Sequence, residues 1–416
     1  MVKTYILMFG IANIVAGGPI YNCNKIKYLK ENGWNVIVFP IDSGRIYIKP
    51  LEQYSDRTFP FIKVSPFFYS QKEREKKIDL LASNVSAANE IIIETGTDFT
   101  ALWGELLAER LGAKHIIFFL DEKNEQVNKY TAPFYRFKYE RGELASISMK
   151  SLTYIFGPHI DLREPEKHIL SATCSNAVCD IESDIVDKIP VGDYSIGSIG
   201  RLDKPFVQNI IDAICEFSCE FPDKKVAVSL LGGADDSIIE QIKKKLKKQS
   251  NIRFYISGYI WPIPQNIFKK IDVFISAAGS SRVSANQGVP TIRLDVISYR
   301  PEGVLVDLNN NKSVKVCRDD VTICDYLRSI LIEKKKFKIT GNVSINEEWN
   351  AIVKNYDKHM EFLQNTSKEK KYYPTFHLWD RSFKSILKKI LFLLFGTDNY
   401  YRLKNKKEVK IGGTDR

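Results

Sequence analysis

The sequence lacks the features that mark redox, metal-binding and membrane-spanning proteins. Seven cysteines occur in 416 residues, and none form a Cys-x-x-Cys pair, so neither a zinc ribbon nor a dithiol redox site is indicated. We read them as ordinary cytosolic thiols. No apolar run approaches the roughly 18 to 20 residues of a spanning helix. Nor is there an internal repeat of 20 to 50 residues, which excludes a solenoid.

Outside the C-terminal tail, positive and negative charges nearly balance. Lys and Arg number 61 against 50 Asp and Glu, so the formal net charge is +11. The last 50 residues hold 13 Lys and Arg and 5 Asp and Glu, a net of +8, which leaves +3 for the rest. A protein that binds nucleic acid usually carries a basic stripe over its folded domains. The charge distribution therefore argues against nucleic acid as a partner.

The basic tail contains an amphipathic segment at 381–396, RSFKSILKKILFLLFG. Its apolar residues recur at helical spacing, and its lysines fall largely outside that stripe. Such a helix is too short to cross a bilayer but suits an anionic membrane surface. We expect peripheral attachment to the inner face of the cell membrane, with a helix that packs back on the first domain as the alternative. The stripe comprises Phe383, Ile386, Leu387, Ile390, Leu391 and Leu394.

Short apolar runs alternate with longer segments of helical period, which predicts an α/β protein with parallel sheets. The rhythm is interrupted between Ser151 and Asp193, where no clear helix is evident, so we expect a domain boundary near Pro190. The predicted parts are residues 1–190, 191–343, a closing helix at 344–366 and the tail at 367–416. The expected strands lie at 5–9, 35–40, 90–94, 115–120, 194–200, 226–232, 252–258 and 272–279.

The second unit carries an ordered set of turns. A strand ends in Gly200-Arg201-Leu202 with Lys204 nearby, the next ends in Leu231-Gly232-Gly233, and a later strand, Asp272 to Ile275, leads to Gly288-Val289-Pro290. This order resembles the nucleotide-binding half of GT-B glycosyltransferases of the group 1 or family 4 type. The resemblance implies two Rossmann-like, doubly wound domains facing a cleft, and a nucleotide-sugar donor bound without a metal or other cofactor.

The same turns fit a diphosphate on physical grounds. Arg201 and Lys204 supply positive charge beside a helix start, where anions are favoured. Glycines allow the backbone to approach a base and ribose closely. The alternative is a surface arginine and ordinary turns. The expected donor-binding residues are Gly17, Gly18, Arg201, Lys204, Gly233, Gly258, Tyr259, Gly279, Ser280, Ser281, Arg300 and Glu302.

The first unit offers weaker candidates. Gly17 and Gly18 follow the first strand, as in the opening of the resembled family, and could let a loop approach a phosphate or an acceptor. Asp121 and Glu122 follow a strand, at the edge where α/β sheets hold their sites, and are the candidate catalytic bases. Glu94 and Asp98 flank the preceding turn. A helix cap or a solvated acid is the alternative for each.

Two histidines complete the candidates of the first unit. His159 lies near the expected edge of the cleft, although a lone histidine is more often structural. His115 begins a strand and is expected to be buried and satisfied.

One absence bears directly on function. The resembled family carries two glutamates seven residues apart between the strand and the Gly-x-Pro turn, where they bind donor sugar and ribose. Here the segment Ala277 to Pro290 has no acid at all. Ser280, Ser281, Ser284 and Asn286 are the neutral groups that it offers instead. Either the donor pocket differs from that of the family, or turnover has been lost.

A second resemblance begins at the same turn. Pro290 is followed, after nine residues, by Arg300-Pro301-Glu302-Gly303-Val304. This is similar to a segment of the non-hydrolysing UDP-N-acetylglucosamine 2-epimerases, although two other signatures of those enzymes are absent. Arg300 and Glu302 are therefore candidates on the nucleotide side, the alternative being that Glu302 caps a helix.

The function that best fits the sequence is transfer of a sugar from a nucleotide-sugar to a membrane-associated glycan or lipid-linked acceptor in cell-surface polysaccharide synthesis. The alternatives are a UDP-sugar 2-epimerase-like enzyme and a non-catalytic GT-B partner subunit.

Overall fold

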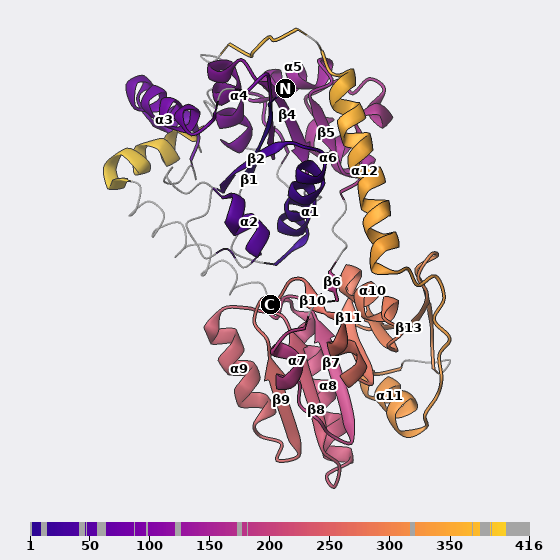
Figure 1. The fold of residues 1–416 in the computed structure, drawn as a ribbon. Helices are drawn as coiled ribbons and strands as arrows, with labels where there is room; N and C mark the ends of the chain where they lie inside the picture. Colours follow the sequence, from indigo (N-terminus) through magenta and orange to yellow (C-terminus); the bar gives the residue numbers. More distant parts are fainter. Residues whose placement is uncertain are drawn as a thin grey trace.

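The computed structural model consists of two α/β domains stacked end to end (Figure 1). It describes residues 2–9, 15–40, 46, 48–55, 64–86, 88–96, 99–120, 126–172, 177–180, 182–316, 321–367, 369–374, 383 and 385–396.

The first domain is built on a five-stranded parallel sheet in the order β2-β1-β3-β4-β5. Side chains alternate between its faces with period two. Tyr5 and Leu7 pack in one core cluster, whereas Ile6 and Met8 pack in another. The strands are β1 (Lys3–Phe9), β2 (Asn35–Pro40), β3 (Glu90–Thr95), β4 (Lys114–Phe119) and β5 (Leu144–Ser146).

Helices cover both faces of this sheet. One core cluster combines α1 with α12 (Ile345–Asn365), and the other combines α3 with α4. The elements are α1 (Gly17–Glu31), α2 (Lys49–Tyr54), η1 (Pro66–Phe68), α3 (Gln71–Ser83), α4 (Phe99–Leu111), α5 (Ala132–Glu140), α6 (Met149–Phe156) and η2 (Pro165–His168). The short helix α7 (Ile185–Lys188) packs instead with the second domain (Figure 1).

The second domain holds a seven-stranded sheet in the order β14-β13-β12-β11-β7-β8-β9. Its strands are parallel from β12 to β9, and β13 and β14 are added antiparallel at one edge. A separate pair, β6 (Val178–Cys179) with β10 (Ile263–Pro264), is also parallel. The strands are β7 (Tyr194–Ile199), β8 (Val226–Leu231), β9 (Ile252–Ile256), β11 (Val273–Ala277), β12 (Thr291–Leu294), β13 (Pro301–Asp307) and β14 (Lys312–Val314).

Helices also flank the second sheet, and its core again divides by alternation. Val273 and Ile275 pack in one cluster, while Phe274 between them packs in another. The helical elements are α8 (Phe206–Glu220), α9 (Asp236–Leu246), η3 (Gln265–Lys270), α10 (Ala278–Asn286), α11 (Ile323–Leu327) and a π turn, η4 (Arg328–Ile332).

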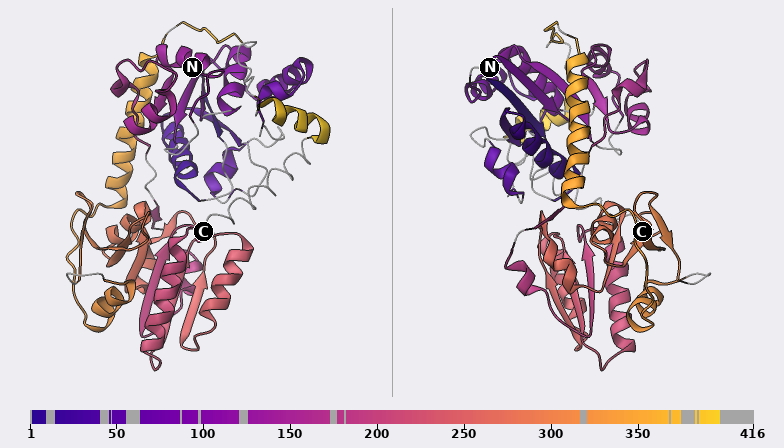
Figure 2. Two further views of the ribbon diagram at one scale, coloured as in Figure 1. Left: turned by 180° about the vertical axis from the view of Figure 1, so that it is seen from behind. Right: turned by 45° about the vertical axis from the view of Figure 1, so that its right-hand side comes forward.

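The chain then returns to the first domain through α12 (Ile345–Asn365), which runs along that domain in both views (Figures 1 and 2). Ser344 and Glu347 form a capping box at its start. The residues that follow α12, 366–367 and 369–374, are called the strap here. The strap is held on the first domain, because Lys114 Nζ donates to Thr366 Oγ1 at 2.6 Å. Glu105 Oε1 accepts the backbone N–H of Tyr373 at 2.8 Å.

The structure confirms all eight expected strands and the expected closing helix. One prediction was wrong: the region from Ser151 to Asp193 is not free of helix, since α6 extends into it and is capped by Ser148. The predicted domain limits stay predictions, although the second sheet begins at Tyr194. Residues 385–396 of the tail are helical. Among the described residues, no helix has the length and apolar character needed to cross a membrane.

Candidate functional site

The strand order of the second sheet reverses between β7 and β11. Running outward from β7, the chain builds β8 and β9 on one side before it crosses to β11 and β12 on the other. In sheets of this kind ligands bind beyond the carboxyl ends of the strands at such a reversal, because the adjacent loops turn away from each other there. The loops after β7 and β11 therefore define the candidate site.

Two glycine turns bring the loops after β7 and β8 into close contact. A Cβ on Gly232 would lie 1.7 Å from the carbonyl oxygen of Gly200, so only glycine fits. Gly200 itself has a φ of +131° and donates its N–H to Leu231 O at 3.1 Å. The turns thus present peptide backbone at the carboxyl edge.

The next strand adds an aromatic ring to the same place. A Cβ on Gly233 would lie 2.7 Å from the ring of Tyr259, which follows β9. Gly258, just before that tyrosine, has a φ of +69°. Gly233 and Tyr259, predicted separately as donor-binding residues, are neighbours in the fold.

Helix α10 begins at the other side of the reversal. Its N-cap residue, Ala277, makes no side-chain hydrogen bond to the first turn. Ser280 Oγ lies 3.3 Å from where a Cβ of Gly200 would be, and a Cβ on Gly279 would meet nothing within 4 Å. The buried Ser281 is turned inward, since its Oγ donates to Ala278 O at 2.7 Å. The helix start offers N–H groups and a positive dipole end to an anion.

Arg201 follows β7, and its guanidinium is already paired with the carboxylate of Asp203. Its Nε donates to Asp203 Oδ1 at 2.9 Å, and its Nη2 donates to Asp203 Oδ2. The hydrogen bond that Arg201 donates to Asp203 is the main cause of the raised pKa of Arg201. Burial alone would raise the pKa of Asp203, yet the bond from Arg201 lowers it. Lys204 is exposed at the start of the following helix.

Asp203 is the residue that sequence reasoning missed, although the signal was local. An aspartate two positions after an arginine can reach its guanidinium within one turn. The pair fixes the arginine side chain. An incoming phosphate would have to share that guanidinium with the carboxylate.

The second motif lies on the antiparallel edge. Arg300 is exposed in the turn between β12 and β13, and Glu302 is on β13. Glu302 Oε2 lies 2.6 Å from Nε of Arg293 on the neighbouring strand. The alternative that Glu302 caps a helix was therefore wrong, because the segment is a strand and its carboxylate is held across the ladder.

Among the described residues, the candidates of the first domain are Gly17, Gly18, Glu94, His115 and His159. Gly17 and Gly18 are the first two residues of α1, and a Cβ on Gly18 would meet nothing within 4 Å. Asp98, Asp121 and Glu122 lie outside the described residues. His159 is exposed beside a surface hollow of about 740 Å³.

Glu94 is neither a helix cap nor a solvated acid. Its carboxylate accepts hydrogen bonds from Tyr5 at 2.5 Å and from Tyr21 at 2.8 Å, and Lys25 Nζ lies 3.6 Å away. Burial lowers the pKa of Lys25 against the opposing effect of Glu94, and it holds the pKa of His359 well below its ordinary value. Because His359 belongs to α12, this cluster is a joint between α12 and the first sheet.

His115 is buried and satisfied, as expected. Its Nδ1 lies 2.6 Å from Glu105 Oε2, and its Nε2 lies 2.9 Å from Thr95 Oγ1. Lys138 Nζ donates to Glu105 at 2.8 Å and to Glu143 at 2.7 Å. Burial lowers the pKa of His115, so a neutral ring donates from Nδ1 to the carboxylate. The arrangement resembles a catalytic triad but is enclosed, so it stabilises the fold.

The two domains meet at Trp261. This residue lies between β9 and β10 and packs against a core cluster of the first domain. Beside it is a hollow of about 550 Å³, to which Lys27 of α1 and Ser344 at the start of α12 contribute. The loop after β9 thus reaches from the candidate site to the other domain.

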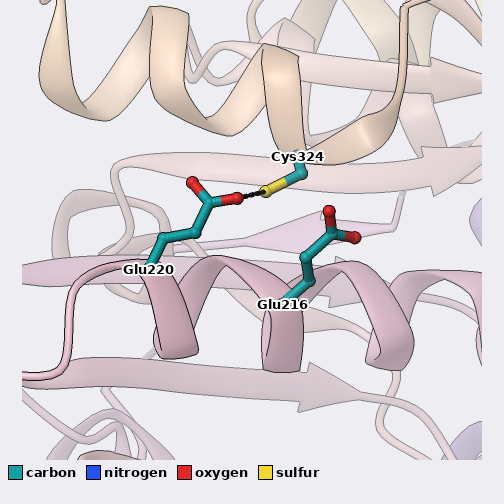
Figure 3. Close-up of side chains that lie close together, drawn as sticks. All are labelled: Glu216, Glu220 and Cys324. Atoms are coloured by element: carbon teal, nitrogen blue, oxygen red, sulfur yellow. Dashed lines mark hydrogen bonds between the residues drawn. The ribbon is translucent and has the colours of Figure 1, made fainter.

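Within the described residues, one set of acids and a thiol is close enough to hold a metal ion (Figure 3). Glu216 and Glu220 of α8 lie near Cys324 of α11. Both oxygens of Glu220, however, accept hydrogen bonds from Arg328, at 2.7 and 2.8 Å. Burial raises the pKa of Cys324 to about 12, which keeps it a thiol. The set is an ion pair with a buried thiol, and its chemistry does not fit a metal site.

No protein-family model matches the sequence, and no curated protein matches it. Solved structures do. The S. aureus MnaA–UDP co-structure aligns with a TM-score of 0.50 and 14% identity over 89% of this chain and 99% of that chain. Anabaena Alr3699/HepE in complex with UDP gives 0.50 and 13%, over 86% and 98%. A UDP-N-acetylglucosamine 2-epimerase gives 0.49 and 16%, over 90% and 100%.

At these identities the likeness concerns the fold. The expected α/β architecture of two doubly wound, GT-B-like domains is confirmed. The narrower resemblance to the group 1 or family 4 type stays a prediction.

Proposed function

We propose that the protein is a glycosyltransferase that transfers a sugar from a nucleotide-sugar to a membrane-associated glycan or a lipid-linked acceptor. The observation that carries this is the convergence of the glycine turns after β7 and β8, Tyr259 and the start of α10 at the reversal point of the second sheet. Both fold neighbours with a TM-score of 0.50 were solved with UDP, which supports a uridine nucleotide as the donor carrier.

The proposed residues act mainly on the leaving group. The acceptor oxygen would form a bond to the anomeric carbon, while the bond from that carbon to the phosphate oxygen breaks. The nucleoside diphosphate that departs carries additional negative charge. Arg201, Lys204 and the N–H groups at the start of α10 would stabilise it. Tyr259 and the backbone at Gly233 would accommodate the base and ribose.

The donor pocket would bind the sugar and ribose through neutral hydrogen-bonding groups. Hydroxyl groups of serine donate and accept hydrogen bonds, so Ser280 can bind a sugar hydroxyl without a carboxylate. Asp121 and Glu122 are the proposed bases for the acceptor hydroxyl. No metal or other cofactor enters this scheme, because cationic side chains and the helix start carry the phosphate charge.

A UDP-sugar epimerase is the second candidate, favoured by the segment from Arg300 to Val304 that follows Gly288-Val289-Pro290. Such an enzyme would change its UDP-sugar without an acceptor and without net release of UDP. A non-catalytic partner subunit is the third candidate, since the segment Ala277–Pro290 has no acid. It would bind nucleotide without turnover.

One assay separates the three. The full chain is incubated with UDP-, GDP- and TDP-sugars, with and without a lipid-linked acceptor, and nucleotide release and sugar identity are followed. Acceptor-dependent release of nucleoside diphosphate supports the transferase. A changed sugar without acceptor identifies the epimerase. Binding without either product, unaltered by Arg201→Ala, identifies the partner subunit, and no binding of any of these donors refutes the proposal.

A further inference from the structure

Phe392 packs the helix at 385–396 against the first domain. Phe392 is 6% exposed and packs with Val64 and Phe68, its ring centroid 5.6 Å from that of Phe68. Its ring also meets Tyr69 edge-on at 5.3 Å. Both views show this helix beside α3 (Figures 1 and 2). The helix is therefore docked on the body rather than extended from it.

The apolar stripe of the helix points away from the body. At about 100° per residue, Phe383, Leu387, Ile390 and Leu394 lie within about 40° of the direction opposite to Phe392. Their exposed fractions are 82%, 47%, 47% and 72%. An amphipathic helix of a globular protein normally turns its apolar stripe toward the core. Here the orientation is reversed, so the stripe faces outward as a continuous apolar surface.

Charge identifies the partner that fits this surface. The segment 381–396 contains Arg381, Lys384, Lys388 and Lys389 and no acidic residue. By the same geometry, Lys388 and Lys389 lie about 40° and 60° from the direction of Phe392, on the flanks of the helix nearer the body. An apolar stripe with cationic flanks is complementary to a bilayer with anionic headgroups, since the stripe enters the acyl boundary while the cations remain among the phosphates.

The size of the surface argues against a second copy of the chain. A helix of 12 residues is about 18 Å long, and with a width of about 10 Å its outer face covers about 180 Å². A stable protein interface buries about 800 Å² on each partner. The same length falls short of the roughly 30 Å of a hydrocarbon core, so the helix cannot span it. A bilayer has no such minimum area, because it accepts each apolar side chain separately.

We propose that the helix at 385–396 is a pre-docked membrane anchor, clamped to the first domain by Phe392 so that its apolar stripe lies in an anionic bilayer surface. The clamp would hold α3 and the turn at Val64–Tyr69 next to the membrane. The first domain would then meet the bilayer in one fixed orientation. This inference stands apart from the proposed function, since lipid binding requires neither nucleotide nor turnover.

The test is co-sedimentation of the full chain with vesicles of phosphatidylcholine alone and with 30% phosphatidylglycerol. We expect binding to the anionic vesicles and at least about tenfold weaker binding of the double variant Ile390→Glu with Leu394→Glu. Both side chains point outward, so the fold should be retained. Val191→Glu, which changes a side chain 72% exposed on another part of the molecule, is the matched control and should bind as the wild type does.

Hydrogen exchange tests the clamp separately. Vesicles should protect the amides of 64–69 as well as those of the tail, and Phe392→Ser should confine the protection to the tail. Equal binding of the wild type and the double variant would overturn the anchor. So would a dimer in light scattering that the double variant dissociates, because a second copy would then cover the stripe. Protection at 64–69 that survives Phe392→Ser would overturn the clamp.

Discussion

The two domains use their buried polar groups in different ways. In the first domain, Glu94 is buried with Lys25 and His359, and Glu105 is buried with Lys138. At the second sheet, the described loops bring glycines, serines and a helix start together around a reversal of strand order. The first domain thus pairs its buried charges with one another, whereas the loops of the second sheet leave backbone N–H groups available.

This difference assigns different work to the two domains. Buried ion pairs resist separation, because removal of one partner leaves the other desolvated. Those of the first domain bind α12 and the strap, and so hold the returning chain in place. Backbone donors and a fixed arginine bind an anion with little rearrangement. We therefore expect changes in the first group to alter stability and changes in the second to alter ligand affinity.

The largest expected effect comes from Lys138→Met. The substitution leaves Glu105 and Glu143 without the ammonium group that lies 2.8 and 2.7 Å from them. Loss of one member of a buried pair costs about 3 to 5 kcal/mol. Urea unfolding should show this decrease, while UDP affinity measured well below the unfolding midpoint should be unchanged. A decrease in the free energy of unfolding of less than about 1 kcal/mol, the size expected of a surface ion pair, would contradict a stabilising role for this network.

Acid should weaken the same network over a defined range. Burial alone would raise the pKa of Glu105, but Lys138 and His115 lower it to about 2 from an ordinary value of 4.5. The folded state therefore gains stability above about pH 4.5 and loses it as the pH falls from there toward 2. The difference corresponds to about 3 kcal/mol. Unfolding free energies between pH 5 and 2.5 should fall more steeply for the wild type than for Lys138→Met, and parallel curves would contradict this.

A smaller effect is expected from Gly232→Ala, at the carboxyl edge of the second sheet. The added Cβ would meet the carbonyl oxygen of Gly200 at 1.7 Å, and the two turns must separate. We expect a loss of about 2 to 3 kcal/mol and no measurable UDP binding. Gly279→Ala is the control for stability, because its Cβ would meet nothing within 4 Å. If Gly232→Ala were as stable as that control, the turns would not be in the contact described.

The sequence predicted those parts of the fold that depend on local pattern. Continuous apolar runs identified eight strands, because strands covered on both faces need them. Strand β14 has the sequence Lys312–Val314 and is too short and polar to give such a signal. Helix α6 was missed because its cap, Ser148, lies outside the stretch that looked irregular.

The candidate site was predictable to a similar degree. Its glycine and arginine turns carry local signals, but the approach of Ser280 to Gly200 depends on strand order. The burial of Glu94 depends on contacts between residues such as Lys25 and His359, which are 334 positions apart. No spacing within the sequence reports contacts of that range.

We expect the reversal point of the second sheet to bind a nucleoside diphosphate. Titration calorimetry of UDP with the wild type, Arg201→Ala and Arg328→Ala tests it most directly. Arg328 is the matched control, an arginine of the same domain that is paired with a carboxylate on α8. We predict that UDP binds, that Arg201→Ala weakens binding about tenfold or more, and that Arg328→Ala changes it less than about twofold. Absence of UDP binding, or equal affinities in all three proteins, would contradict the account.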